Sequence, residues 1–250
     1  MSRLADLTSP EVARLGDVVL VVPLGSTEQH GPHLPLSTDA DVAVALASRV
    51  SARPDVVVAP PVPYGSSGEH EGFAGTLSVG QAALELLLVE LVRSATGTFG
   101  RVLLLSAHGG NAEPVNRAVD RLRREARDVR AWSPRWRGDA HAGRVETSVQ
   151  LALDPARVRP AREAGNPAPL ESLLPVLRTA GVLEVSPNGV LGDPSGATAA
   201  EGAALLAAAA ADLAGLLDRW PPAPAGGPVP TAPRTESPPP ARDAPTGGPR

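Results

Sequence analysis

The chain has 250 residues, a formal net charge of −4 and a hydrophobic fraction of 42%, values that fit a soluble globular protein with a sizeable core. It contains no cysteine, which excludes disulfides, zinc knuckles and thiol catalysis. It also contains no lysine, which excludes Schiff-base chemistry and lysine-dependent phosphate loops.

The charge pattern favours neither nucleic acid nor a membrane as a partner. The Arg-rich run at 121–130 is typical of a solvated helix face. Residues 1–10 lack the pattern of a signal peptide, and no uninterrupted apolar run reaches the ~18 residues that usually span a membrane. We therefore expect a cytoplasmic protein.

Short apolar runs alternate with longer helical patterns along the chain. In chain order, the predicted elements are a strand at 17–24, a helix at 41–50, a strand at 56–59, a helix at 79–94, a strand at 101–106, a helix at 113–127, a buried element at 145–153 interpreted as a helix that begins at Glu146, and a long helix at 197–220. This alternation predicts a three-layer α/β/α fold with a mostly parallel central sheet.

The composition changes abruptly at Pro221. Residues 221–250 are rich in proline and offer almost nothing to bury, which predicts a disordered tail. The folded domain is therefore predicted to span residues 1–220.

All five histidines lie in short segments rich in glycine, asparagine or acidic residues. A single histidine in such a segment is more often a surface or hydrogen-bonded residue. Five in similar settings favour a functional site, because two of the segments directly follow predicted strands and ligands of open α/β sheets bind at the carboxyl ends of strands. The histidines are His30, His33, His70, His108 and His141.

The segment after the first strand carries a potential metal site. Glu28 and His30 lie two residues apart, and Asp39 lies near the start of the next helix. Carboxylate and imidazole ligands suit Zn, Mn or Fe, and one carboxylate can bridge two ions about 3.5–4 Å apart. The competing interpretation of Asp39 is a helix cap.

Two later segments add further candidates. His108 opens an HGGN turn after the third strand, a weak signal that fits a phosphate cradle or an oxyanion hole equally well, and Asn111 suits a turn or helix cap. In DAHAGRVE, Glu146 follows His141 closely, so that His141 is free for general acid–base work if Glu146 binds metal. The sequence contains no G-x-S-x-G elbow and no dinucleotide or P-loop fingerprint.

Four ordered motifs, GSTEQHGPHLPLSTD, YGSSGEHEGFAGTLS, LLLSAHGGN and DAHAGRVETS, resemble the creatininase (creatinine amidohydrolase) family over most of residues 15–205. The resemblance implies a homo-oligomeric hydrolase that cleaves amide C–N bonds with two divalent ions, expected to be Zn, Fe or Mn. It implies that Glu28, Asp39 and His108 hold one ion. It also implies that His30, Asp39 and a further carboxylate hold the other, with Asp39 bridging.

One departure from the family pattern bears on the substrate. Creatinine amidohydrolase has a glutamate two residues after the histidine of its third motif, where this chain has Gly110. Glu146 is the predicted replacement, as in the HGGN branch of the family, and the change argues against creatinine. The combination of HGGN, DAHAGRVETS and the late segment GVLGDPSGATAAEG resembles members that remove a C-terminal dipeptide from a modified ribosomal peptide. The alternatives are an amidohydrolase of a small cyclic amide or formamide, and a non-catalytic metal-binding scaffold.

The residues themselves suggest a hypothesis for catalysis and substrate contact. His141 and Glu146 are the predicted catalytic residues, with His141 moving a proton to the departing nitrogen. Trp136, together with Trp132, is predicted to form a lid, with a subunit interface as the alternative, and a solvated turn is the alternative for the GEHEG loop. The substrate-contact candidates are Glu69, His70, Asn111 and Trp136.

Overall fold

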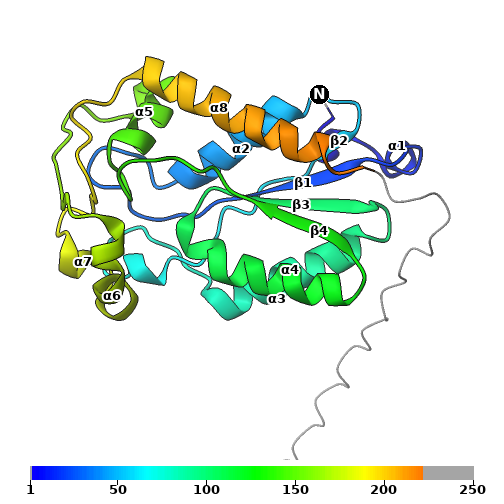
Figure 1. The fold of residues 1–250 in the computed structure, drawn as a ribbon, viewed down its shortest axis with the longest axis horizontal. Helices are drawn as coiled ribbons and strands as arrows, with labels where there is room; N and C mark the ends of the chain where they lie inside the picture. The colour runs from blue at the N-terminus through cyan, green and yellow to red at the C-terminus, as the bar shows by residue number, and fades with distance from the viewer. Residues whose placement is uncertain (1, 222–250) are drawn as a thin grey trace, which may run out of the picture.

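The computed structural model describes residues 2–221 of the chain. Its centre is a four-stranded sheet in the order β2-β1-β3-β4, with every neighbouring pair parallel (Figure 1). Helices cover both faces, so the predicted three-layer α/β/α fold is confirmed. The strands are β1 (Val19–Leu24), β2 (Val56–Val58), β3 (Arg101–Ser106) and β4 (Asp128–Trp132).

The two central strands are buried along their whole length because helices cover both faces of the sheet. Their side chains alternate between the faces. Val19 and Val21 of β1 pack into one core cluster, and Leu20 and Val22 pack into the other. A continuous apolar run in the sequence therefore supplies both halves of the core.

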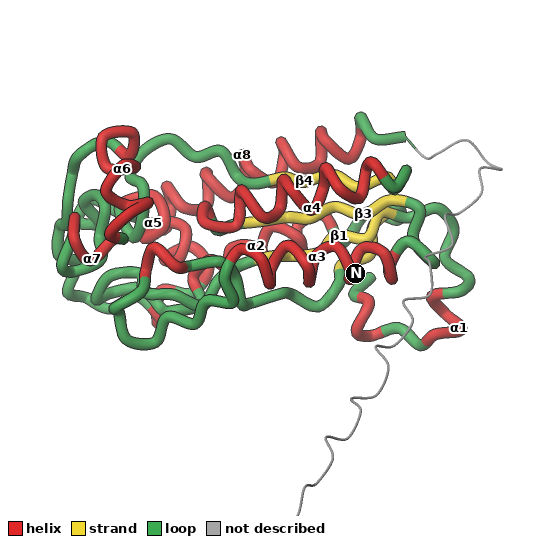
Figure 2. The backbone as a smooth tube through the Cα atoms, turned by 90° about the horizontal axis from the view of Figure 1, so that it is seen from below, coloured by secondary structure: helices red, strands yellow, loops and turns green. Residues whose placement is uncertain are grey.

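Five helices form the two outer layers. The first cluster lies under α2, α5 and α8, and the second under α3 and α4. Figure 1 shows these two sets of helices on opposite sides of the sheet, and Figure 2 looks onto the side covered by α3 and α4. Their bounds are α2 (Thr38–Val50), α3 (Gln81–Ala95), α4 (Ala112–Arg124), α5 (Arg144–Leu153) and α8 (Ala199–Asp218). The predicted helices match these within a few residues, and α5 begins two residues before Glu146.

The predicted helix at 113–127 is too long. α4 ends at Arg124, and Ala126 then takes a positive φ of 57°, which breaks the helix before β4 begins. The Arg-rich run at 121–130 is therefore divided between α4 and β4. The prediction missed β4 because this edge strand, with the sequence DVRAW, carries polar residues and lacks an apolar run.

Short elements that the sequence did not predict gather mainly at one end of the molecule. α6 (Leu170–Ala180) and α7 (Val182–Val185) contact the short 3-10 helix η2 (Gly68–His70), whereas α1 (Ser9–Val12) lies at the opposite end (Figure 1). The remaining single turns are η1 (Leu4–Asp6), η3 (Gly109–Asn111) and η4 (Pro155–Arg157). The predicted Pro-rich tail lies outside the described residues, apart from Pro221.

Within residues 2–221, α8 is the one helix long and apolar enough to cross a membrane by length and composition alone. It nevertheless packs along α5 and α2, and three of its leucines lie in the core. These are Leu206, Leu213 and Leu217. The face of α8 that carries these leucines therefore covers the sheet.

Replacing Leu213 with Ala should lower the free energy of unfolding by about 2–5 kcal/mol, because the side chain is fully buried between α8 and the sheet. Chemical denaturation measures this change. The matched control is Leu86→Ala on α3, whose side chain is 56% exposed and should cost far less. Equal losses in the two variants would contradict the placement of α8 in the core.

Candidate metal centre

The loops that follow three strands converge at the carboxyl edge of the sheet. Glu28 and His30 come from the loop after β1, His108 from the turn after β3, and His141 from the loop after β4. Two more acidic residues come from the first turns of helices. These are Asp39 of α2 and Glu146 of α5.

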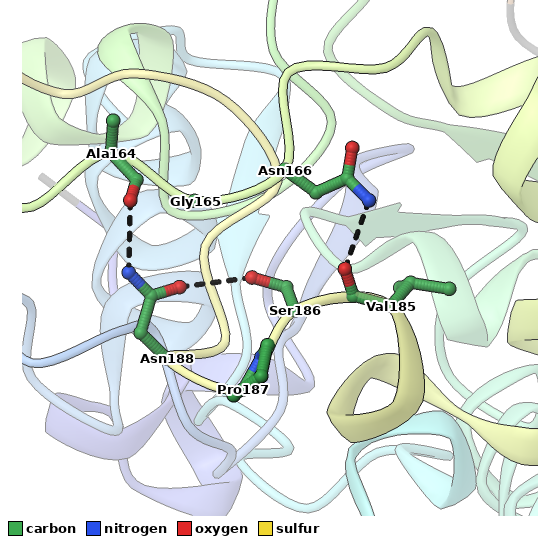
Figure 3. Close-up of a pocket in the computed structure, with 7 residues that line it drawn as sticks. All are labelled: Ala164, Gly165, Asn166, Val185, Ser186, Pro187 and Asn188. Carbon is green, nitrogen blue, oxygen red and sulfur yellow. Dashed lines mark hydrogen bonds between the residues drawn. The ribbon is translucent and has the colours of Figure 1, made fainter.

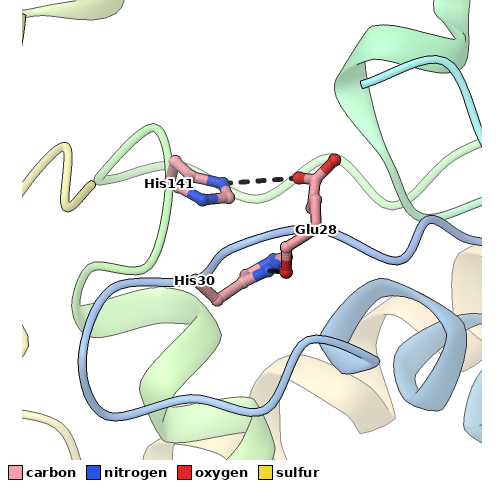
Figure 4. A group of neighbouring side chains, drawn as sticks. All are labelled: Glu28, His30 and His141. Carbon is pink, nitrogen blue, oxygen red and sulfur yellow. Dashed lines mark hydrogen bonds and ion pairs between the residues drawn. The ribbon is translucent and has the colours of Figure 1, made fainter. Parts of the chain in front are cut away.

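Three groups of these residues each bring one possible ligand atom per residue within 4.8 Å of one another. All members are buried except Glu146, which is half-buried. The structure thus brings together all of the predicted metal ligands, and His141 with them. Figure 4 shows His141 beside Glu28 and His30. The groups are Glu28–Asp39–His108, His30–Asp39–Glu146 and Glu28–His30–His141.

Asp39 stands between two histidines. Its Oδ1 lies 3.3 Å from Nε2 of His30, and its Oδ2 lies 3.2 Å from Nδ1 of His108. Nδ1 of His108 is also 3.2 Å from Oε1 of Glu28. α2 has no side-chain cap hydrogen bond, and Asp39 lies one residue inside the helix, so the capping alternative is not realised. Each oxygen of this carboxylate faces a different imidazole, as a bridging ligand requires.

Main-chain carbonyls orient the two imidazoles. Nδ1 of His30 lies 3.2 Å from the carbonyl oxygen of Glu28, and Nε2 of His108 lies 3.0 Å from that of Ser66. A carbonyl oxygen only accepts, so these nitrogens carry the protons. In the neutral ring, the other nitrogen of each histidine carries the lone pair and lies beside the carboxylates, where a metal ion would bind, which is how metal-binding histidines are normally held.

Several buried acceptors in this cluster have no hydrogen-bond partner in the described part of the chain. Leaving such atoms unpaired is costly, and a divalent cation satisfies several at once. Nitrogen and carboxylate donors also match the preferences of Zn, Mn and Fe. The residues therefore fit a metal centre. The unpaired acceptors are both carboxylate oxygens of Glu28, Oδ2 of Asp39 and Nε2 of His30.

The electrostatics lead to the same conclusion. Burial opposes the charged form of His30, yet Asp39, followed by Glu146 and Glu28, raises the pKa of His30 to about 10. The pKa of His108 is likewise raised well above its usual value, because Glu28 and Asp39 outweigh burial. The carboxylates stabilise positive charge on any group that lies between them.

Gly110 explains why the last carboxylate comes from another element. A Cβ at this position would overlap the carbonyl oxygen of Ser66 and the carboxylate of Glu69. A glutamate at position 110 would therefore not fit the loop as it stands. Glu146 instead places Oε2 3.9 Å from Nε2 of His30. This geometry supports Glu146 as the predicted replacement ligand.

The GEHEG loop lies against the centre. His70 is buried, with Nε2 3.3 Å from Oε1 of Glu28. Glu69 is partly exposed, with Oε1 3.5 Å from Nε2 of His108, and burial raises its pKa. The alternative of a solvated turn does not fit His70, and the substrate contacts predicted for both residues remain predictions.

Two other candidates have structural roles. Asn111 is fully buried; its Oδ1 accepts from the N–H of Ser66 at 2.9 Å, and its Nδ2 donates to the carbonyl of Gly25 at 3.0 Å. It does not cap α4 with its side chain but ties two loops together, and its predicted substrate contact remains a prediction. Trp132 lies in the core, where its Nε1 donates to Asp212, so it is not part of a lid.

Trp136 is partly buried and packs against the same core cluster, and its predicted substrate contact remains a prediction. His33 turns away from the carboxylates: its Nε2 lies 2.8 Å from Oγ1 of Thr147. Burial lowers the pKa of His33 to about 4.

Sequence reasoning missed Gln29, whose only signal was its place between two candidate ligands.

A separate pocket lies between residues 164–166 and 185–188 (Figure 3). Its polar side chains bond to one another and to the main chain: Nδ2 of Asn188 donates to Ala164 at 3.1 Å, and Nδ2 of Asn166 donates to Val185 at 2.9 Å. It contains no titratable side chain. The metal centre is therefore the stronger candidate for chemistry.

Comparisons with known proteins agree with this geometry. The creatininase family profile, described as creatinine amidohydrolase, matches residues 5–217. The mycofactocin precursor peptide peptidase of Mycobacterium tuberculosis is 50% identical over 220 residues, covering 83% of this chain and 87% of the relative. That of Mycolicibacterium smegmatis is 50% identical over 230 residues, covering 88% of this chain and 92% of the relative.

Among solved structures, a creatininase described as its Mn form has a TM-score of 0.73 at 26% identity, covering 89% of this chain and 100% of that one. The chain belongs to the creatininase family of hydrolases. The family assignment predicted from the four motifs is confirmed.

Replacing His108 with Ala should remove bound metal and activity together, because its Nδ1 lies 3.2 Å from both Glu28 and Asp39 and is the nitrogen ligand of their cluster. The measurement is elemental analysis by mass spectrometry of protein loaded with Zn or Mn and then desalted. Glu113→Gln, on the exposed first turn of α4, is the matched control and should keep its full metal content. Full metal content in the His108 variant would exclude this residue as a ligand.

Proposed function

We propose that this chain is a metal-dependent peptidase that removes a C-terminal dipeptide from the mycofactocin precursor peptide during redox-cofactor biosynthesis. The observation that carries the proposal is the cluster of buried, unpaired ligand atoms in a chain half identical to peptidases of that name. This chain has Gly110 where creatinine amidohydrolase has a glutamate, and Glu146 is the predicted ligand in its place. This difference also favours a substrate other than creatinine.

The metal assignment follows the two clusters around Asp39. Glu28, Asp39 and His108 would hold one divalent ion, and His30, Asp39 and Glu146 the other. When bound, such ions lower the pKa of an attacking water and polarise the scissile carbonyl. Zn, Mn and Fe all suit this donor set, and a homo-oligomer in the cytoplasm is the accompanying proposal.

His141 supplies a base beside this centre. Its Nε2 donates to the carbonyl oxygen of Gln29 at 2.8 Å, which leaves the lone pair on Nδ1. Nδ1 lies 3.9 Å from Oε1 of Glu28 and 4.0 Å from Oε2 of Glu146. Burial, followed by His30, lowers the pKa of His141 and keeps the ring neutral at neutral pH. His141 can therefore take a proton from water and pass it to the departing amide nitrogen.

A hydrolase of a small cyclic amide is the second candidate. The likeness of the fold to creatininase over nearly the whole chain favours it. Both candidates use the same carboxylates and the same base, so they differ in the substrate alone. A metal-binding scaffold without catalysis is disfavoured, because His141 presents a free lone pair that metal binding by the other residues does not need.

The substrate is tested by mass spectrometry of the metal-loaded, full-length protein incubated with the modified precursor peptide, alongside a chelated sample. We expect metal-dependent loss of a C-terminal dipeptide. Absence of cleavage in a sample shown to contain metal would refute the peptidase. A panel of cyclic amides and formamides, tested in parallel, would then identify the second candidate.

Replacing His141 with Ala should lower kcat by roughly 10²–10⁴-fold, the usual contribution of a general acid–base group. Metal content should stay at the wild-type level, because the two clusters around Asp39 are complete without it. Steady-state kinetics and elemental analysis of the same sample measure both quantities. Loss of metal would make His141 a ligand in the cluster with Glu28 and His30, and normal turnover would remove it from the reaction.

A further inference from the structure

The side chain of Gln29 lies between two histidines of the site and touches both. Gln29 is buried, and its Nε2 is 2.8 Å from Nδ1 of His70 and 3.1 Å from Nε2 of His141. The two rings are neighbours, with centroids 4.4 Å apart. The proposed reaction gives the side chain of Gln29 no task, although Gln29 stands between Glu28 and His30 in the sequence.

Main-chain groups fix the direction in which the amide points. The N–H of Gly31 donates to Oε1 of Gln29 at 2.8 Å, and Nε2 donates to the carbonyl oxygen of Gly189 at 3.1 Å. If the amide were reversed, its NH₂ group would face the N–H of Gly31, and its oxygen would face the carbonyl oxygen of Gly189. Gly189 has a φ of 77°, and a Cβ there would overlap the amide of Gln29, so this close approach requires glycine.

The fixed amide determines the tautomer of His70. Because Nε2 of Gln29 is a donor, Nδ1 of His70 must accept. The proton of the neutral ring is then on Nε2, which lies 3.3 Å from Oε1 of Glu28. His70 therefore presents an N–H group to the carboxylate end of the site.

His141 has its tautomer fixed by the main chain of the same residue. Its Nε2 donates to the carbonyl oxygen of Gln29, so Nε2 carries the proton. The two amide protons of Gln29 go to His70 and to the carbonyl oxygen of Gly189, so the 3.1 Å approach of Nε2 of Gln29 to Nε2 of His141 is a contact between two donors and not a hydrogen bond. Nδ1, which carries the lone pair, faces Glu28 (Figure 4) and also lies 4.0 Å from Oε2 of Glu146. Gln29 thus contacts both rings. His70 presents an N–H group to the carboxylate of Glu28, and His141 presents a lone pair to the same carboxylate.

We propose that Gln29 is a positioning residue that makes His70 a hydrogen-bond donor and His141 a proton acceptor. A donor suits the amide oxygen on which negative charge develops, and a lone pair suits the proton of the attacking water. The assignment of tautomers is independent of the substrate, whereas the use made of them rests on the proposed function.

The direct test is Gln29→Glu, which keeps the shape of the side chain and replaces its donor group with an acceptor. Long-range ¹H–¹⁵N spectra of zinc-loaded, histidine-labelled, full-length protein report the tautomer of each of the five histidines. We expect His70 to change from the Nε2–H form to one with a proton on Nδ1. His141 should stay in the Nε2–H form, because its partner is a main-chain carbonyl.

The matched control is Gln81→Glu, at the exposed start of α3, which should leave all five histidine signals unchanged. If the new charge unfolds the Gln29 variant, Gln29→Met removes the donor without adding charge, and His70 should then populate both tautomers. An unchanged His70 signal in a folded Gln29 variant would overturn the proposal.

Kinetics give a second readout. Gln29→Glu should lower kcat by about 10–100-fold, as removal of an orienting partner typically does, with KM and metal content little changed. In the double variant with His70→Ala, Gln29→Glu should lower kcat little further, because both changes remove the same donor. Additive losses would overturn the proposal. A wild-type protein that cleaves no precursor peptide would refute the proposed function, while the spectra would still decide the tautomers.

Discussion

Negative charge buried at the carboxyl edge of the sheet is the constraint on which the site depends. Glu28 and Asp39 are almost fully buried, and Glu146 is half-buried beside them. Such a group of carboxylates is stable only if positive charge stands among them. The carboxylates raise the pKa values of His30 and His108, which favours positive charge on both rings. A pair of divalent ions would supply that positive charge while both imidazoles stay neutral.

The fold supplies the geometry that this charge requires. Parallel strands end at one edge, so the loops after β1, β3 and β4 meet there although they are far apart in the sequence. The first turns of α2 and α5 add carboxylates from helices that also cover one face of the sheet. Packing of the core and assembly of the site are therefore achieved by the same elements.

Much of the fold could be predicted from the sequence, because its central strands are apolar runs and its covering helices have clear periodicity. The edge strand β4 could not, since its polar residues lack that signal. The grouping of Glu28, His30, Asp39 and His108 could be anticipated from motifs that follow strands. The structural role of Asn111 and the burial of Trp132 depend on tertiary contacts that no local pattern encodes.

Gln29 illustrates the same limit within the site. Its amide contacts His70, His141 and Gly189, which lie 41, 112 and 160 positions away, and only the folded chain brings these residues together. Gly110 is the opposite case: the sequence alone revealed the departure from creatinine amidohydrolase. The structure then gave its physical reason, since Ser66 and Glu69 fill the space that a side chain would need.

The central claim is that two ions share Asp39. Anomalous diffraction from crystals of the manganese-loaded protein, collected at the metal absorption edge, tests it most directly. The account predicts two peaks on opposite sides of the Asp39 carboxylate, one beside Glu28 and His108 and the other beside His30 and Glu146. A single peak, or a second peak bound by His141 in place of Glu146, would contradict it.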